Sequence, residues 1–309
     1  MKDLIIIGAG PAGLTAGLYA ARKEMNALIL TKEFGGQPMW TSGVENYMGF
    51  QMITGPELMM KFNEQIQQFP LEIKYEEALE ITHEKNDNGF NFFKVRTSSE
   101  TYESKTVIIA TGKRPRKLNV PGEEKFIGRG VAFCATCDGP FYKGKKVAVV
   151  GGGNSAVQAA LELSRIASEV YLIVRKDYAA DPILIRRLEE SKQIKILVNS
   201  QITEIQGEDA VSTIFVKNTE TESIVEIQID GIFIEIGLDS NSEFVKPLLE
   251  LNSSNEILIG MNCETSIAGL WAAGDVTEIY QNQIIIAAGE GAKASLGAFE
   301  YLMRMDKNE

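Results

Sequence analysis

The sequence has few of the side chains that most often bind metals or form disulfide scaffolds, with three cysteines and one histidine among 309 residues. Three cysteines are too few for the disulfide framework of a secreted domain, and in a reducing compartment a close cysteine pair is more often catalytic or metal-binding. A zinc site would need four ligands. Beside Cys134 and Cys137 the chain offers only Cys263 and His83, both far away in the sequence.

Long apolar runs and an excess of positive charge are also missing. The first apolar run covers only residues 4–7, too short for the core of a signal peptide, and no run reaches the roughly 18 apolar residues that a membrane-spanning helix needs. The net charge of −11 argues against binding to nucleic acid, whose phosphates require a basic surface. We therefore expect a cytoplasmic protein that binds neither membranes nor nucleic acid.

A glycine motif near the N-terminus predicts a dinucleotide site. Gly8, Gly10 and Gly13 complete the pattern G-x-G-x-x-G inside residues 4–30, which have the pattern of an apolar strand, a helix and a second apolar strand. In such a unit the glycines permit a tight turn, and the free N–H groups at the start of the helix favour a pyrophosphate. A threonine follows the second strand where many such units carry an acid for the ribose, and Glu33 is the nearest acid.

A second unit of the same kind lies in the middle of the chain. The pattern G-x-G-x-x-A begins with Gly151 and Gly153 inside residues 147–174, again between two apolar strands. Asn154 and Ser155 follow these glycines at the start of the expected helix, so they are candidate cofactor contacts. Two such units indicate two nucleotide sites, and the alternative is a motif that only packs a helix against a sheet.

Two more turns follow apolar strand patterns. One pattern ends at Gly112, and another ends at Gly274 and Asp275. A helix rich in alanine and glycine is expected from about Ile284, and its small residues permit close packing. By themselves these are ordinary strand–turn elements.

Each half of the chain also contains alternating patterns typical of antiparallel strands, with hairpin turns expected at 86–89 and 218–223. The polar, proline-bearing stretches 112–124 and 237–247 are expected to cross between the halves. We therefore predict an α/β fold with two Rossmann-like three-layer (ββα) nucleotide-binding domains, the first of them discontinuous. The expected boundaries are 1–115 with 242–309 for the first domain, and 116–241 for the second.

Two of the three cysteines form the pattern C-x-x-C just before the second glycine motif. If the pair of Cys134 and Cys137 lies at the start of a helix, the free N–H groups there would stabilise a thiolate, and the second cysteine could resolve a mixed disulfide. The alternatives are a zinc site or two buried, inert cysteines. Asp138 follows directly, and its simplest structural role is to cap the helix.

The stretches "GAGPAGLTAGLYAAR", "FGGQ", "VENYMGF", "IIATG", "VAFCATCDGP" and "QIIIAAGEGAKAS" together resemble the low-molecular-weight thioredoxin reductases. They are also similar to the C-terminal reductase part of the flavoprotein subunit of alkyl hydroperoxide reductase. The resemblance extends from Asp3 to about Leu302. That flavoprotein carries a further N-terminal disulfide-relay domain, and the start of this chain at the first glycine motif favours a stand-alone thioredoxin reductase.

The resemblance implies FAD in the discontinuous first domain and a homodimer. Its pyrophosphate would lie at the first glycine motif. Other contacts would come from the residues that match the family's motifs: Glu33, Gln37, Asn46, Gly112, Gly274, Asp275 and Gln283. Members of the family usually carry arginine before that glutamine, and this chain has Asn282 instead.

The resemblance also implies an electron path. Electrons would pass from a nicotinamide nucleotide through FAD to a Cys134–Cys137 disulfide, and then to thioredoxin or a thioredoxin-like protein. Cys137 would be the thiol next to the flavin, Cys134 would attack the partner, and Asp138 would supply and accept the proton. Because one rigid arrangement cannot serve all these contacts, the family rotates one domain on its two linkers.

The electron donor is where the sequence departs from the family. NADPH-specific relatives carry a basic cradle, H-R-R-x-x-x-R, for the 2′-phosphate, and this chain retains only Arg175 and Lys176 in "VRKDYAAD". Since charge-assisted hydrogen bonds to phosphate are strong, we expect NADPH rather than NADH. Reduced ferredoxin is a further alternative as donor. The alternative functions are reduction of a disulfide protein of a peroxiredoxin system and a flavin redox sensor without turnover.

Overall fold

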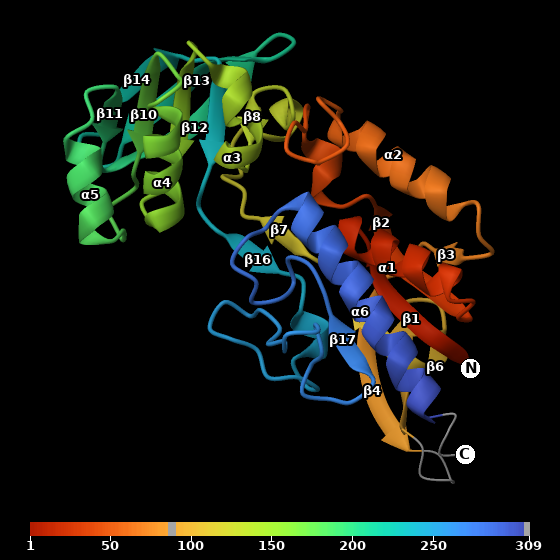
Figure 1. Cartoon of the computed structure of the whole chain (residues 1–309). Helices are drawn as coiled ribbons and strands as arrows, with labels where there is room; N and C mark the ends of the chain where they lie inside the picture. The colour runs from red at the N-terminus through yellow and green to blue at the C-terminus, as the bar shows by residue number, and fades with distance from the viewer. Residues whose placement is uncertain (86–90, 306–309) are drawn as a thin grey trace.

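The computed structural model describes residues 1–85 and 91–305. The hairpin turn expected at 86–89 therefore lies outside the described residues. Figure 1 shows two groups of strands and helices, with the short strands β7 and β16 between them. Each group is built around one of the two glycine motifs.

The first group is a seven-stranded sheet with the order β3-β2-β1-β6-β5-β4, in which β17 also pairs with β6. Its strands are β1 (Lys2–Ala9), β2 (Ala27–Phe34), β3 (Glu72–Lys74), β4 (Ala78–Lys85), β5 (Asn91–Thr97), β6 (Thr101–Ile109) and β17 (Leu270–Ala272). The pairs β1–β2, β1–β6 and β17–β6 are parallel. Strand β1 is apolar throughout its centre because both faces of the sheet are covered.

Two helices cover one face of this sheet (Figure 1), namely α1 (Pro11–Arg22) and α6 (Ile284–Met305). They approach closely because α6 carries small residues. A Cβ atom at Gly291 would lie 2.0 Å from the carbonyl oxygen of Ala12. The C-terminal part of the chain therefore completes the first group through β17 and α6, as the sequence predicts.

The second group contains a parallel sheet with the order β11-β10-β9-β15-β8 and an antiparallel sheet with the order β12-β13-β14. The strands are β8 (Val131–Ala132), β9 (Lys146–Val150), β10 (Glu169–Ile173), β11 (Ile194–Leu197), β12 (Ser200–Gly207), β13 (Val211–Asn218), β14 (Ile224–Gln228) and β15 (Gly231–Ile234). Its helices are α3 (Ala135–Asp138), α4 (Asn154–Leu163) and α5 (Pro182–Glu189). The hairpin turn predicted at 218–223 joins β13 to β14, which confirms that prediction.

Two helices, α5 and one earlier in the chain, are not predicted from the sequence. Helix α2 (Gly55–Ile66) begins with a capping box in which Thr54 accepts a hydrogen bond from the backbone N–H of Glu57 (3.3 Å) and Glu57 accepts one from the N–H of Thr54 (3.1 Å). The pattern Thr-x-x-Glu, with proline in the first turn, is a recognised signal for the start of a helix. It was present in the sequence as "TGPE".

The two predicted crossings lie side by side. Strands β7 (Lys113–Pro115) and β16 (Leu238–Ser240) form a two-stranded antiparallel sheet, and an ion pair joins Arg116 to Asp239 (2.9 Å). Both strands fall inside the stretches that the sequence predicts as crossings. In Figure 1 they lie between the two groups.

Candidate active site

A large cavity of about 1340 Å³ is lined by residues of both groups. This volume exceeds that of a typical pocket for a small ligand, roughly 300–1,000 Å³, and suits a dinucleotide. Most of the predicted site residues line it: Gly8, Gly10, Glu33, Gln37, Asn46, Gly112, Cys134, Cys137, Asp138, Ser155, Gly274, Asp275 and Gln283. Other predicted site residues lie outside its lining: Gly13, Gly151, Gly153, Asn154, Arg175 and Lys176.

The first glycine turn leaves backbone open to the cavity. A Cβ atom at Gly10 would meet no other atom within 4 Å, and Gly10 caps α1 without any side-chain hydrogen bond. The N–H groups of the first helical turn are therefore available to an anion. Gly13 serves packing instead, because its Cβ would lie 1.9 Å from the carbonyl oxygen of Gly8.

Asp275 lies at the turn after β17, on the wall of the cavity. Burial raises the pKa of its carboxyl to about 6, and the positive charge of Lys113 opposes that rise. The carboxylate forms no hydrogen bond with another described residue, so it can accept one from a ligand hydroxyl. The turn itself is held by Glu290, a buried acid of α6 that accepts the N–H of Gly274 (2.8 Å). Sequence reasoning missed Glu290, whose only signal is that it is an acid among small residues.

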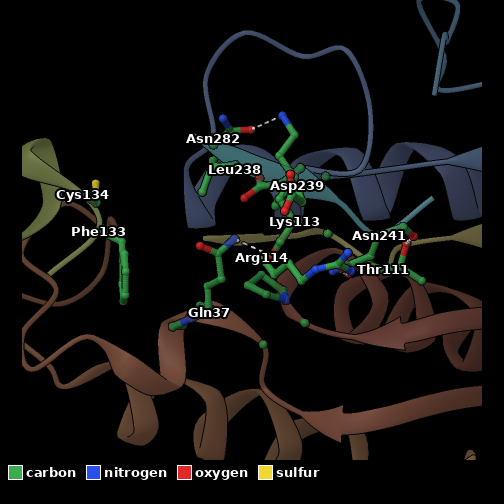
Figure 2. Close-up of a pocket in the computed structure, with 18 of the residues that line it drawn as sticks. Gln37, Thr111, Lys113, Arg114, Phe133, Cys134, Leu238, Asp239, Asn241 and Asn282 are labelled. Atoms are coloured by element: carbon green, nitrogen blue, oxygen red, sulfur yellow. Dashed lines mark hydrogen bonds between the residues drawn. The ribbon is translucent and has the colours of Figure 1, made fainter. Parts of the chain in front are cut away.

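Residues far apart in the sequence meet at the same wall. The side-chain amide of Asn46 donates to the Oε1 atom of Gln283 (3.1 Å). The amide of Gln37 donates to the backbone oxygen of Lys113 (3.0 Å), as Figure 2 shows, and thereby joins the first group to strand β7. Glu33 lies exposed among the residues that line the cavity.

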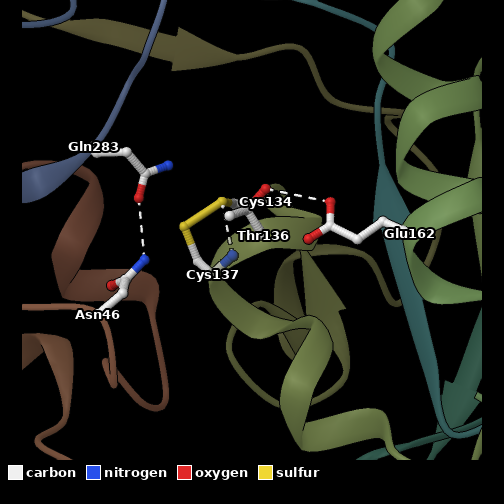
Figure 3. Close-up of a disulfide and its surroundings, with 6 residues drawn as sticks. All are labelled: Asn46, Cys134, Thr136, Cys137, Glu162 and Gln283. Carbon is white, nitrogen blue, oxygen red and sulfur yellow. Dashed lines mark hydrogen bonds between the residues drawn. A yellow bond between two sulfur atoms is a disulfide. The ribbon is translucent and has the colours of Figure 1, made fainter. Parts of the chain in front are cut away.

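Cys134 and Cys137 form a disulfide, as the resemblance implies. Cys134 occupies the N-cap of α3, and its Sγ atom accepts the N–H of Cys137 (3.1 Å). The pair therefore does begin a helix, although α3 has only four residues before the chain tightens into a 3-10 turn. In Figure 3 the Cys137 sulfur lies on the side of the disulfide that faces Gln283 and Asn46.

Asp138 follows Cys137 directly in the chain and lines the same cavity, with 8% of its surface exposed. Burial raises the pKa of this carboxyl from 3.8 to about 7. Its backbone N–H donates to the carbonyl oxygen of Cys134 (3.1 Å), which fixes the acid relative to the cysteine pair. Near pH 7 the group is present in both its protonated and its ionised form, as a proton donor and acceptor requires.

The second glycine turn is braced by the loop that follows β10. The N–H of Ala179 donates to the carbonyl oxygen of Gly152 (2.8 Å), and the side chain of Asn154 exchanges two hydrogen bonds with Asp181 (2.7 and 3.1 Å). Ser155 donates to the carboxylate of Glu235. The side chains of Asn154 and Ser155 therefore bind within the chain, while a Cβ atom at Gly153 would meet nothing within 4 Å.

Arg175 and Lys176 lie exposed at the start of this bracing loop. Neither forms an ion pair or a hydrogen bond with another described residue. Both cations are thus available to a ligand at the second glycine turn.

The third cysteine has no part in this site. Cys263 is fully buried, and burial raises the pKa of its thiol to about 12, so it matches the predicted role of a small core residue. In the described part of the chain no helix has the length and apolar character that crossing a membrane requires.

Residues 2–291 match the sequence model of the family described as pyridine nucleotide-disulphide oxidoreductase. The chain belongs to this family. Among solved structures, thioredoxin reductase from Streptococcus pyogenes MGAS5005 is 39% identical, with a TM-score of 0.93 over 98% of this chain and 99% of that one. Thioredoxin reductase from Lactococcus lactis in its FR conformation is 37% identical, with a TM-score of 0.66 over 98% and 100% of the two chains.

Curated relatives carry other names. A subunit of alkyl hydroperoxide reductase from Pseudomonas putida is 40% identical over 98% of this chain, and the protein of the same name in Staphylococcus aureus strain N315 is 41% identical over 98%. A protein named NADH dehydrogenase from Bacillus subtilis is 37% identical over 98%. The chain spans about three-fifths of the length of these relatives, 58% for the Pseudomonas protein and 59% for the other two.

Membership of this oxidoreductase family implies FAD and a nicotinamide nucleotide as cofactors. The residues at the two glycine turns and around the cavity fit both cofactors. The open backbone at Gly10 suits the phosphates of a dinucleotide, and the carboxylate of Asp275, which has no hydrogen-bond partner among residues 1–85 and 91–305, suits its hydroxyls. The open space at Gly153 suits a second dinucleotide. The fold is thus that of a flavin disulfide oxidoreductase like thioredoxin reductase, with one disulfide in its cavity.

Proposed function

We propose that this oxidoreductase takes electrons from a pyridine nucleotide and passes them, through FAD and the Cys134–Cys137 disulfide, to thioredoxin or a thioredoxin-like protein. One observation carries the proposal: the disulfide lines the same cavity as the first glycine turn and Asp275. A structural disulfide would have no need of a shared cavity with a dinucleotide site. A redox sensor without turnover would have no need of a second glycine turn or of a buried acid beside the cysteines.

The cysteine pair and Asp138 have separate roles in this scheme. FAD, when bound, supplies the two electrons that open the disulfide. Cys137 is the thiol next to the cofactor, because its sulfur faces Gln283 and Asn46 in Figure 3. Cys134 attacks the disulfide of the partner, and Cys137 then resolves the mixed disulfide. Asp138 holds the proton that the released thiolate takes up.

We further propose that residues 1–115 with 242–309 and residues 116–241 rotate against each other about β7 and β16. The need for rotation follows from the position of the second glycine turn, since Gly151 and Gly153 lie outside the lining of the cavity while the disulfide lies inside it. The two thioredoxin reductases have similar identity to this chain but TM-scores of 0.93 and 0.66. Such a difference is expected when related chains differ in the arrangement of two domains.

A second candidate partner comes from the curated relatives. Several of them are named as a subunit of alkyl hydroperoxide reductase. The same cysteine chemistry would then reduce a disulfide protein of a peroxiredoxin system. The cavity is identical in both cases, so only the protein that Cys134 attacks differs.

The proposed function predicts that the purified protein binds FAD and becomes colourless when reduced anaerobically by a pyridine nucleotide. NADPH, NADH and reduced ferredoxin should be added in separate titrations while the flavin absorbance is followed. We expect NADPH to reduce the flavin and ferredoxin to have no effect. Thioredoxin and a peroxiredoxin-system disulfide protein, added next, should restore the flavin absorbance for the true partner. A protein that takes up no FAD would contradict the proposal.

The choice of nucleotide depends on Arg175 and Lys176. Replacing both with alanine should raise the KM for NADPH about tenfold, because two exposed charge-assisted contacts to the 2′-phosphate are lost, and should leave the KM for NADH unchanged. Asp177→Asn, in the same loop, is the matched control, since loss of its negative charge should not raise the KM for NADPH. If the double variant and the wild type have the same KM for NADPH, the two cations do not select the donor.

A further inference from the structure

One lysine in the wall of the cavity has no role in the scheme above. Within the described part of the chain, four cationic side chains line the cavity: Lys32, Lys113, Arg114 and Arg116. Three of them are exposed and form surface ion pairs with Glu77, Glu243 and Asp239. Lys113 alone is buried, with 6% of its side chain exposed. A buried lysine is costly unless its charge has a partner, so its place at this wall needs an explanation.

The ammonium group of Lys113 is only partly satisfied by the chain. Its Nζ atom donates to the Oε1 atom of Glu256 (2.5 Å) and to the Oδ1 atom of Asn282 (3.4 Å), toward which it points in Figure 2. The other oxygen of Glu256 accepts the amide of Asn252 (2.6 Å). An ammonium has three N–H donors. The third one has no partner in the described residues, at a point where the side chain lines the cavity.

The neighbours of Lys113 show which part of a dinucleotide it would meet. Asn282 precedes Gln283, whose amide oxygen pairs with Asn46 in front of the disulfide. Asp275 lines the cavity as well, and it is close enough that the charge of Lys113 opposes the rise that burial causes in the pKa of its carboxyl. Lys113 is therefore placed between the turn that suits ribityl hydroxyls and the residues that face the disulfide. Electrons must leave FAD at the disulfide, so this is the flavin end of the cavity.

We propose that Lys113 contacts the flavin ring with its third N–H and supplies the positive charge that raises the reduction potential of the bound flavin. The inference rests on the proposed function, since it requires FAD in this cavity. A cation next to the ring stabilises the added electrons, and the protein tunes a flavin through such charges and hydrogen bonds. Asn282 is uncharged, so among the described residues of this wall Lys113 supplies the positive charge next to the flavin ring. Glu256 forms an ion pair with Lys113 and thereby weakens the effect of this positive charge on the flavin.

Two substitutions with opposite expected effects test this. Lys113→Met removes the cation and leaves the carboxylate of Glu256 without its ion-pair partner. The potential of the bound flavin should therefore fall, and the dissociation constant of FAD from the apoprotein should rise about tenfold or more. Glu256→Gln keeps the cation and removes its counter-charge, so the potential should rise. Lys113→Arg is the control that keeps the charge, and its potential should lie nearer the wild type than that of Lys113→Met. Potentials are measured by spectroelectrochemistry, and affinities by titration of apoprotein with FAD.

The outcomes separate the ways in which the inference can fail. A wild-type apoprotein that binds no FAD would defeat the proposed function itself. If FAD binds but Glu256→Gln and Lys113→Met shift the potential in the same direction, or not at all, the pair is a structural salt bridge and the inference is wrong. If Lys113→Met weakens FAD binding without any change of potential, the lysine contacts the pyrophosphate, and the inference is again wrong. If Lys113→Met fails to fold, Glu256→Gln tests the inference by itself: a rise in the flavin potential supports it, and a fall or no change contradicts it.

Discussion

Replacing Cys134 with serine is expected to abolish reduction of protein disulfides while the bound flavin is still reduced by the nucleotide. The variant retains the cavity, the first glycine turn and Cys137, so electrons still enter at FAD. It lacks the thiol that attacks the partner, and the disulfide in the cavity can no longer form. The measurement is turnover with thioredoxin beside an anaerobic bleaching of the flavin in the same preparation.

Cys263→Ser is the matched control for this substitution. Cys263 is the remaining cysteine of the chain, and it is buried in the core of the first group, outside the cavity. Its replacement should leave reduction of protein disulfides near the wild-type rate. Residual reduction of thioredoxin by Cys134→Ser would show that electrons reach the partner by another path. Loss of flavin reduction in the same variant would show that the cysteine pair has a role earlier in the sequence of steps.

Replacing Asp138 with asparagine is expected to slow thiol–disulfide exchange about a hundredfold, the lower range for loss of a general acid or base. Asparagine has nearly the same shape but cannot supply a proton. The pKa of Asp138 is raised to about 7, so the acid form is present below pH 7 and is lost as the pH rises through that value. The wild-type rate of disulfide opening should therefore fall above pH 7, and the rate of Asp138→Asn should be low at every pH. Rapid-mixing measurements of disulfide reduction across pH 5–9 check both expectations.

The stability of Asp138→Asn provides the control. The folded state holds the proton of Asp138 up to about pH 7, whereas the unfolded state releases it near 3.8. Folding therefore binds a proton between these values, and the wild type loses stability relative to the variant as the pH rises through this window. The melting temperature of Asp138→Asn should thus exceed that of the wild type most clearly above pH 7. If both melting temperatures have the same pH dependence, the pKa of the Asp138 carboxyl is not raised in solution.

Local patterns predicted much of the fold. The apolar runs around the glycine motifs became β1, β2, β9 and β10, because parallel strands buried on both faces need continuous apolar sequence. The sequence pattern predicts that the helix after the second glycine motif runs to about Ala167, whereas α4 ends at Leu163. Helix α2 was missed, although its capping box was visible.

The sequence predicts site residues best where their type and spacing are typical of a single chemical role. The C-x-x-C pattern, Asp138 and the glycine turns were all identified from spacing or from the resemblance, and the structure places the cysteines and Asp138 at the cavity. Asn154 and Ser155 show the limit, because whether a side chain is free for a ligand depends on partners such as Asp181 and Glu235. Those partners lie 27 and 80 residues away in the chain.

By itself, the sequence determined the two strand–turn–helix units, their glycine turns and the close pair of cysteines, because each depends on residues that are near one another in the chain. Only the tertiary structure decided that the Cys134–Cys137 disulfide shares a cavity with the first glycine turn, and that Lys113 is buried against Glu256 across 143 residues. Burial and electrostatic pairing between distant segments arise from packing, which no local pattern of residues encodes.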